Sequence, residues 1–361
     1  MTTELMLRTC DSDLRSWDSF KWPESGPVEA PDWDPAPRCG GGLHGLLWGK
    51  GNGGELLDWR IPAKWLVCEI NSEDIVHTPG GKIKVPKATV VHCGDQLSAT
   101  NYLIAHGGKG RIDGASVAAG HNTTIETGEH GSATVGHHST AFAGNYGTAV
   151  AGEDGIATTR NLGTSKVGKH GTASSLNYGT SIAGEYGEAI ARECGVAVAG
   201  DRGLAETGFK GKSISGYGGT SVVGFGGTAV SGDEGTSIAD DSGVAISGYH
   251  GKSSSGKYGK SDSGTYGTSR TGSRGRASAG LQGTASAGEG GEIQILWVDV
   301  ETTQTLVGHI GEDGLLPDTK YKVGVGGKFC KVEEETDDNW DWAEFRQESR
   351  RHGRTEDRSI D

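Results

Sequence analysis

The chain has 361 residues, of which 64 are Gly and only nine are Pro, and its formal net charge is −13. This acidity argues against a general nucleic-acid binder, and no apolar run is long enough to form a membrane-spanning helix. Six cysteines lack a framework spacing and no signal peptide precedes them. We therefore expect reduced thiols in a cytoplasmic protein.

Residues 1–114 are predicted to form a small α+β domain. Tryptophan is dense here, and short apolar runs predict strands at 5–8, 65–70, 82–85 and 88–92. Residues 23–38 are rich in Pro and Asp and are expected to be a loop. Residues 95–105 are expected to be a short helix with Asp95 near its N-terminus.

Residues 115–290 are 22 octapeptides without an insertion. When each octad is numbered from 1 to 8, position 1 is Gly in 19 octads and position 6 is Gly in 18. A fixed short period is typical of a stacked solenoid, and regularly spaced glycines predict corners with backbone angles that other residues avoid. Small residues at positions 3 and 5 alternate with larger ones at positions 2 and 4, which predicts a short strand with its small face inward.

The octads that lack Gly at position 6 indicate the length of one structural repeat. They carry Arg160, Leu176, Arg192 and Asp240, whose numbers differ by multiples of sixteen. We therefore expect 11 coils of sixteen residues, each with two strands and two corners, in two parallel sheets packed face to face. An interior of Ala and Ser is too small for the usual sheet separation of roughly 10 Å, so the sheets should lie unusually close.

Residues 291–335 are predicted to form a small β-meander that caps the end of the solenoid. A longer apolar strand is expected at 292–298, and further strands are expected at 306–310, 320–325 and 329–332. Residues 336–361 are mostly charged and are expected to be a partly disordered tail. The N-terminal domain and the cap would each cover one end of the solenoid, where an unpaired strand edge is otherwise exposed.

These segments also carry a resemblance to known sequences. The octads, followed by Pro317-Asp318-Thr319-Lys320-Tyr321 and by Gly327-Lys328-Phe329-Cys330-Lys331-Val332-Glu333, resemble uncharacterised bacterial and phage octapeptide-repeat proteins. Cys39 with Gly42-Leu43-His44-Gly45, and Trp65-Leu66-Val67, are similar to the head region of some members. The resemblance implies this architecture and a bacterial or phage origin. The octads are more weakly similar to ice-nucleation repeats and to trimeric autotransporter heads.

The outward face in the middle of the rod is the main candidate site. Position 4 is mostly aliphatic there, and Phe209 and Phe225 both occupy position 7, one coil apart, so we expect them to stack. A patch of this kind marks an interface, although aliphatic residues also suit a solvent-exposed strand. We expect a side-by-side homodimer through Ile182, Ile190, Val198, Phe209, Ile214, Tyr217, Val222, Phe225, Val230, Ile238 and Ile246.

Two other surface patterns have functional interpretations. A basic stripe formed by Lys252, Lys257, Lys260, Arg270, Arg274 and Arg276 is either a solvated surface, a site for an anionic ligand, or the partner of an acidic stretch in antiparallel pairing. Thr recurs at position 2, and a flat, regular Thr array could order water, which is the basis of an ice-binding hypothesis. Thr also simply suits a strand, and basic residues interrupt the array.

Histidines and cysteines provide the candidates for chemistry. Cys39, His44, His92 and Cys93 are compatible with a zinc site or a Cys/His nucleophile pair, but their spacing matches no standard motif, so packing residues are the alternative. His121 and His137 should lie one coil apart at one corner, with His138 beside them and His130 across the rod. No Cys or carboxylate cluster completes a metal site around them, and we expect neither a metal nor a cofactor.

The sequence thus predicts a capped, self-associating rod without catalytic activity, and a host or phage protein is a second candidate partner. One alternative is an N-terminal head that binds a ligand or catalyses a reaction, with His44 and Cys39 as the first residues to test. Ice binding by the solenoid is another alternative.

Overall fold

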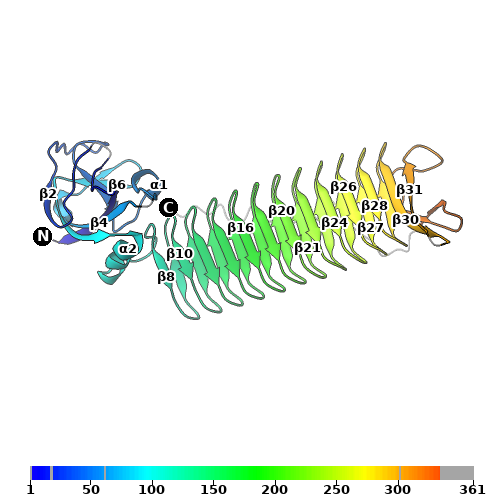
Figure 1. Ribbon diagram of the computed structural model, residues 1–361, viewed down its shortest axis with the longest axis horizontal. Coiled ribbons are helices and arrows are strands. Elements are labelled where there is room, and N and C mark those ends of the chain that lie inside the picture. Colours follow the sequence, from blue (N-terminus) through cyan, green and yellow to red (C-terminus); the bar gives the residue numbers. More distant parts are fainter. Residues whose placement is uncertain (1, 17–18, 61, 301, 334–361) are drawn as a thin grey trace.

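The computed structural model describes residues 2–333 apart from 17, 18, 61 and 301. It shows a small head followed by a long rod of two parallel sheets (Figure 1). The predicted fold class, a mainly β two-sheet solenoid of sixteen-residue coils, is confirmed. The charged tail expected at 336–361 lies outside the described residues.

The head is built on a seven-stranded antiparallel sheet in the order β2-β7-β4-β1-β3-β6-β5. Its two long central strands pair in register from Thr3 with Asn71 to Cys10 with Lys64. The strands are β1 (Thr3–Cys10), β2 (Gly26–Glu29), β3 (Leu43–Leu47), β4 (Lys64–Asn71), β5 (Val76–Thr78), β6 (Lys82–Val85) and β7 (Lys87–Gly94). The range 23–38 was expected to be a loop, but it contains the strand β2, which pairs with β7 at one end of the sheet.

The helices of the head are short. α1 (Gly53–Leu56) is a single turn, η1 (Ser72–Asp74) is a 3-10 turn, and α2 (Gln96–Ala105) is the helix predicted from the sequence. The Asp95 side chain accepts a hydrogen bond from Ser98 N, and the Ser98 hydroxyl accepts one from Asp95 N, so the helix begins with a capping box. Among the described residues, no helix is long and apolar enough to cross a membrane.

The rod consists of two 13-stranded sheets, and 11 strands of each come from the octads. We call them the even sheet and the odd sheet after their strand labels. The even sheet contains β8 (Ser116–Ala118), β10 (Ser132–Thr134), β12 (Thr148–Ala151), β14 (Thr164–Val167), β16 (Thr180–Ala183), β18 (Val196–Ala199), β20 (Lys212–Ser215), β22 (Thr228–Ser231), β24 (Val244–Ser247), β26 (Lys260–Ser263), β28 (Arg276–Ala279), β30 (Glu292–Asp299) and β31 (Thr302–His309).

The odd sheet lies opposite the even sheet. It contains β9 (Thr124–Glu126), β11 (Thr140–Ala143), β13 (Ile156–Thr159), β15 (Thr172–Ser175), β17 (Glu188–Ala191), β19 (Leu204–Thr207), β21 (Thr220–Val223), β23 (Thr236–Ala239), β25 (Lys252–Ser255), β27 (Thr268–Thr271), β29 (Thr284–Ala287), β32 (Tyr321–Val323) and β33 (Phe329–Lys331). Every octad strand pairs in parallel with the strand sixteen residues away, as Thr148 with Thr164 shows.

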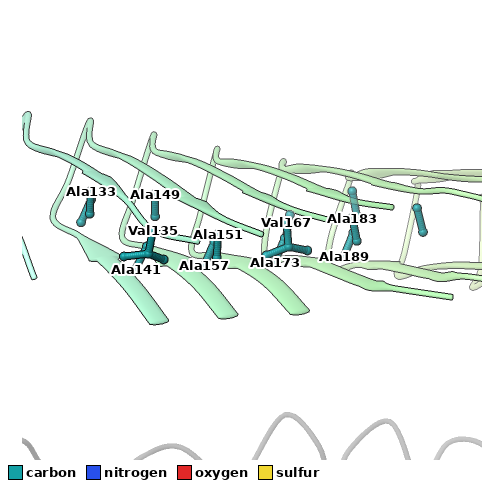
Figure 2. Close-up of a cluster of buried hydrophobic side chains, with 14 of the residues drawn as sticks. Ala133, Val135, Ala141, Ala149, Ala151, Ala157, Val167, Ala173, Ala183 and Ala189 are labelled. Carbon is teal, nitrogen blue, oxygen red and sulfur yellow. The ribbon is translucent and has the colours of Figure 1, made fainter. Parts of the chain in front are cut away.

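The interior of the rod is narrow and is lined by positions 3 and 5. Ala149, Ala173 and Ala197 are fully buried, and Figure 2 shows such methyl groups lying between the two sheets. Buried hydroxyls bond both along and across the interior. Ser165 Oγ lies 3.1 Å from Ser181 Oγ in the next coil, and Ser181 Oγ donates to the Ile190 carbonyl of the odd sheet at 2.5 Å. The prediction of small inward residues and larger outward ones is confirmed by the alternating burial along each strand.

The backbone shows that the corner glycines have a different role from the expected one. The left-handed backbone conformation recurs at position 8, where most residues are not Gly, for example Tyr186 with φ 55° and Arg202 with φ 54°. A Cβ at Gly147, in position 1, would lie 2.7 Å from Ala143 Cβ and 3.0 Å from the Gly131 carbonyl oxygen. A Cβ at Gly184, in position 6, would lie 2.8 Å from the Gly168 carbonyl carbon. The glycines therefore permit close stacking of coils, whereas position 8 makes the bend.

The C-terminal strands extend both sheets. The hairpin of β30 and β31 continues the even sheet, and the hairpin of β32 and β33 continues the odd sheet through the pairing of Ala285 with Tyr321. The cap therefore consists of two hairpins, one on each sheet, in place of the expected meander. Trp297 of the first hairpin packs on Gly327 in the turn of the second hairpin, where a Cβ would lie 2.5 Å from the indole ring.

Asp113 joins the head to the first coils. Its carboxylate accepts hydrogen bonds from Gly53 N at 2.9 Å and from Glu129 N at 2.8 Å, and its own backbone N donates to the Gly49 carbonyl. Burial, together with the nearby Glu129 charge, raises the pKa of the Asp113 carboxyl to about 7, although the two backbone N–H groups oppose the shift. His130 of the rod stacks on Trp59 of the head with ring centroids 4.0 Å apart.

Candidate functional site

The outward surface of the even sheet, which we call the even face, is the most regular surface of the rod. From β12 to β24 it presents positions 2 and 4 of seven consecutive strands. Lys166 and Lys212 are the only charged residues among these outward positions of the seven strands. The other twelve are all Thr, Val or Ile: Thr148, Val150, Thr164, Thr180, Ile182, Val196, Val198, Ile214, Thr228, Val230, Val244 and Ile246.

These twelve side chains share a branch at Cβ, and this property fixes their positions. A β-branched side chain has few accessible χ1 rotamers, so its methyl and hydroxyl groups are held in place. The backbone sets the grid, with about 4.8 Å between strands and about 6.6 Å between alternate residues of one strand. Most of these side chains are half-buried by their neighbours, whereas Thr148, Thr164 and Ile246 are exposed, Ile246 to 38%. The result is a stiff and nearly uncharged array of methyl and hydroxyl groups facing solvent.

The outward surface of the odd sheet, the odd face, is less uniform. Over the seven strands from β11 to β23 it presents Phe142 and Leu204, which are larger than the side chains around them, and the carboxylates of Glu188 and Glu206. Ile238, at position 4 of β23, is only 4% exposed. The odd face therefore lacks the continuous β-branched grid of the even face.

The residues predicted to form one interface are divided among four surfaces of the rod. Ile182, Val198, Ile214, Val230 and Ile246 lie on five consecutive strands of the even face.

The remaining predicted interface residues lie elsewhere. Ile190, Val222 and Ile238 belong to the odd face. Phe209 and Phe225 stack at the corner that follows the odd strands, with centroids 5.8 Å apart, as expected. Tyr217 lies at the opposite corner. Sorting the octads by parity before comparing their outward residues would have identified the uniform even face from the sequence.

The corners carry ladders that connect successive coils. The Asp201 and Asp233 carboxylates accept hydrogen bonds from the backbone N of Tyr217 and Tyr249, each sixteen residues further along the chain. Ring stacking adds to this support, as between His170 and Tyr186 at 5.2 Å. These contacts fix the spacing of the coils and therefore the spacing of the grid on both faces.

The predicted basic stripe surrounds one edge of the rod near its C-terminal end. Lys257 and Arg274 lie on the corner that follows the odd strands. Arg270 lies 3.9 Å from Asp318, and Arg276 forms an ion pair with Glu292 at 2.9 Å. The other members, Lys252 on β25 and Lys260 on β26, lie on opposite faces. Acidic neighbours therefore offset part of this positive charge.

The head does not assemble the predicted Cys/His cluster. His44 is on β3, whereas His92 and Cys93 are on β7, and two other strands separate β3 from β7 in the sheet. That order places the two strands roughly 14 Å apart. Cys39 is exposed. Among the described residues, no group of three or more His, Cys, Asp or Glu side chains is arranged to hold a metal ion.

His44 instead has local partners in the sheet. Its Nδ1 lies 3.0 Å from the Gly42 carbonyl oxygen, and its backbone carbonyl accepts a hydrogen bond from Arg8. Burial, with a smaller effect of the Lys84 and Arg8 charges, lowers the pKa of the His44 imidazole. These contacts describe a packed histidine beside two cations rather than a histidine that activates Cys39.

The histidines at the start of the rod lie where the repeat predicts. His121 and His137 stack one coil apart, with ring centroids separated by 4.9 Å, and the backbone N of His137 donates to His121 Nδ1. His138 Nδ1 is 3.8 Å from an Asp154 carboxylate oxygen. His130 is at the other corner, between Trp59 and Tyr146. Their contacts belong to the corner ladders.

Comparison with known proteins matches only part of the chain. An ice nucleation protein of Pseudomonas syringae pv. syringae is 37% identical over 124 residues, which are 34% of this chain and 10% of that protein. Ice nucleation proteins of Xanthomonas campestris pv. translucens and Pantoea ananas (InaU) are 39% and 37% identical over 103 residues, or 28% of this chain and 6% and 10% of theirs. No family model and no solved structure matches. The chain resembles ice nucleation proteins over about a third of its length.

This comparison changes two expectations. The sequence indicated only a weak similarity to ice-nucleation repeats, but part of the chain is clearly similar to ice nucleation proteins. The predicted cytoplasmic location is wrong, because the matching proteins are bacterial ice nucleation proteins rather than cytoplasmic proteins of a phage-infected cell. The chain spans a tenth or less of the length of each of these relatives.

Proposed function

We propose that this protein is a non-enzymatic repeat rod whose even face orders water into an ice-like layer. The observation that carries the proposal is the composition of that face. Across seven strands every outward residue is Thr, Val or Ile apart from Lys166 and Lys212.

The chemistry of the even face favours ordered water. Methyl groups restrict the orientation of first-shell water without binding it tightly, and threonine hydroxyls can anchor individual waters by hydrogen bonds. On a mobile surface such waters would not share a lattice. Here the β-branched side chains and the corner ladders hold the groups on a fixed grid. The partial similarity to ice nucleation proteins supports the same function.

The test compares the same substitutions on the two faces. Thr180→Lys with Thr228→Lys places two charged, flexible side chains on the even face, and Thr172→Lys with Thr220→Lys does so on the odd face. All four threonines are half-buried residues at position 2. We expect thermal hysteresis at millimolar wild-type protein, its loss in the even-face variant, and its retention in the odd-face variant. Absence of hysteresis in the wild type, or equal loss in both variants, would contradict the proposal.

A second candidate function is self-association through the even face. It is supported by the row of Ile182, Val198, Ile214, Val230 and Ile246, which runs over five consecutive strands and resembles the apolar patches of interfaces. A homodimer is the simplest occupant, and a host or phage protein is an alternative. Light scattering of Ile214→Lys with Val230→Lys tests it. Side-by-side association predicts that the wild-type mass is halved in this variant, and an unchanged mass would contradict it.

A further inference from the structure

The two ends of the rod differ in how their terminal strands are protected. At the N-terminal end the head lies against the first coils through Asp113 and the Trp59–His130 stack. At the other end β31 is the last strand of the even sheet, and within the described residues it is paired on one side only, with β30. Most of its residues are exposed. Figure 1 shows β31 at the end of the rod farthest from the head.

The direction of the backbone groups of β31 follows from its register. Glu292 N donates to Gly275 O of the preceding coil, and Ile310 N donates to Gly291 O. In an antiparallel ladder, alternate residues point their N–H and C=O groups toward the same neighbour. The pairing of Ile293 with Gly308 is therefore a hydrogen-bonded pair, and so are those that follow at every second residue. It follows that Thr303, Thr305 and Val307 direct their backbone groups away from β30, toward the open edge.

Within the part of the chain that the structure describes, this edge lacks the usual protection against pairing. Natural edge strands carry charged side chains, Pro, bulges or a covering segment. β31 has the sequence Thr-Thr-Gln-Thr-Leu-Val-Gly-His, which contains no Lys, Arg, Asp, Glu or Pro. Its eight residues pair with β30 without a bulge. Val298 of β30 and Val307 of β31 are 51% and 46% exposed on the same sheet surface. A long, uncharged edge of high β-propensity is a template for another strand.

We propose that β31 pairs antiparallel with β31 of a second copy of this chain, which joins two rods end to end. A two-fold axis perpendicular to the sheet places the even faces of the two copies on the same side of the joined sheet. Residues that lie opposite each other in the two β31 strands must therefore have side chains on the same face. Centring the axis on Thr305 meets this condition. It places Thr303 opposite Val307 of the partner subunit and forms on the order of six backbone hydrogen bonds.

The association is closed and extends the even face. The head covers the opposite end of each rod, and β33, which ends the odd sheet, has only three residues and carries Lys331. Among the described residues of the rod, β31 is therefore the long uncharged edge, and its pairing gives a dimer and not a fibre. The even sheet of one copy continues into that of the other. The association is independent of the water-ordering function, since β31 lies beyond the seven strands that form the grid.

The direct test is the mass of the full-length chain in solution over a concentration series. We expect the wild type to approach twice its chain mass of 37.4 kDa. Thr305→Pro removes an N–H that points to the open edge, which an edge strand tolerates, so we expect this variant to remain at the single-chain mass. Thr305→Val keeps the N–H and should dimerise. Ile214→Lys with Val230→Lys should also dimerise, which separates this mode from side-by-side association.

A cross-linking experiment covers the case in which Thr305→Pro disturbs the fold. In a background where the exposed Cys39 and Cys330 are replaced by Ser, Thr305→Cys places a thiol beside its own symmetry mate. We expect mild oxidation to give a covalent dimer from Thr305→Cys and none from Thr228→Cys on the even face. A wild-type mass that stays at one chain throughout, dimerisation of a folded Thr305→Pro, or equal cross-linking of the two Cys variants would overturn the proposal.

Discussion

At the scale of single residues, the octad divides two roles of glycine between different positions. One role is to adopt the left-handed backbone conformation, and the other is to leave room for a neighbouring coil. Position 8 adopts the left-handed conformation, and it does so with Tyr, His, Arg and Lys side chains because the corner projects into solvent. Most glycines at positions 1 and 6 lie outside the left-handed region but have no room for a Cβ, as Gly147 and Gly184 show. The distance between coils therefore depends on the absence of a side chain at Gly147 and its equivalents.

This division predicts different costs for two glycine substitutions. Gly147→Ala places a methyl against Ala143 and the Gly131 carbonyl, and overpacking of this kind costs roughly 1–3 kcal/mol. Gly218→Asn at position 8 has φ 61° and only the Arg202 side chain nearby, and Asn tolerates that conformation at a cost below about 1 kcal/mol. Urea denaturation of both variants measures the difference. Equal destabilisation would mean that conformation, not space, selects glycine.

Asp113 gives a pH dependence at the junction of head and rod. Its pKa of about 7 lies above that of an unfolded Asp, about 3.9, so between these values the folded protein binds more protons than the unfolded chain. The free energy of unfolding should therefore fall as pH rises from about 4 to about 7, by at most about 4 kcal/mol from this group. Asp113→Asn should lack this component.

The measurement is urea denaturation of wild type and Asp113→Asn at pH 4.5 and 7.5. Other groups titrate in both proteins, so the quantity of interest is the difference between their pH dependences. A wild-type protein that loses no more stability than Asp113→Asn on going to pH 7.5 would show that Asp113 is ionised throughout.

Particular residues show which features of the fold could be predicted from the sequence and which could not. Arg160, Leu176, Arg192 and Asp240 indicate the sixteen-residue coil, and the structure places all four at the corner after the odd strands. By contrast, the strand β2 was not predicted, because it lies among Pro and Asp residues and pairs, within the described residues, with β7, which is far along the sequence. The spacing of Cys39, His44, His92 and Cys93 could not reveal that two strands separate β3 from β7, because strand order depends on long-range pairing.

At the scale of elements, each octad forms one strand, and successive octads alternate between the even sheet and the odd sheet. The place of an octad in this alternation, its parity, therefore decides on which face its outward residues lie. The predicted interface mixed both parities, since an octad pattern does not by itself distinguish them. Ile214 on β20 and Val222 on β21 are eight residues apart but lie on opposite sheets. Parity also makes the continuity of the even face sensitive to the length of a deletion.

Two deletions test this dependence on parity. Removal of residues 195–210 takes out one coil and joins β16 to β20 within the even face. Removal of residues 195–202 takes out one octad and transfers every later strand to the other sheet, so the Thr, Val and Ile grid divides between opposite faces. Because neighbouring coils in a solenoid contact only each other, we expect both proteins to fold, as circular dichroism would show. Thermal hysteresis should survive only the sixteen-residue deletion, and equal activity would contradict the account.

At the scale of the whole molecule, the rod holds the side chains of each face in a regular register from coil to coil. Its core of small residues buries little apolar surface for each strand, and its regularity comes from continuous backbone ladders and stacked corners. The head covers the first coils, and paired hairpins extend the last ones. This arrangement matches a function in which a repeated surface acts as a unit more closely than one in which a single pocket acts alone.

The most direct measurement of the central claim is the partition of the protein into slowly growing ice. Wild type, the even-face variant with Thr180→Lys and Thr228→Lys, and the odd-face variant with Thr172→Lys and Thr220→Lys are frozen under the same conditions, and the protein in the ice and in the remaining liquid is quantified. We predict enrichment of wild type and of the odd-face variant in the ice, and exclusion of the even-face variant. Exclusion of all three, or enrichment of the even-face variant to the wild-type level, would contradict the assignment of ice binding to the even face.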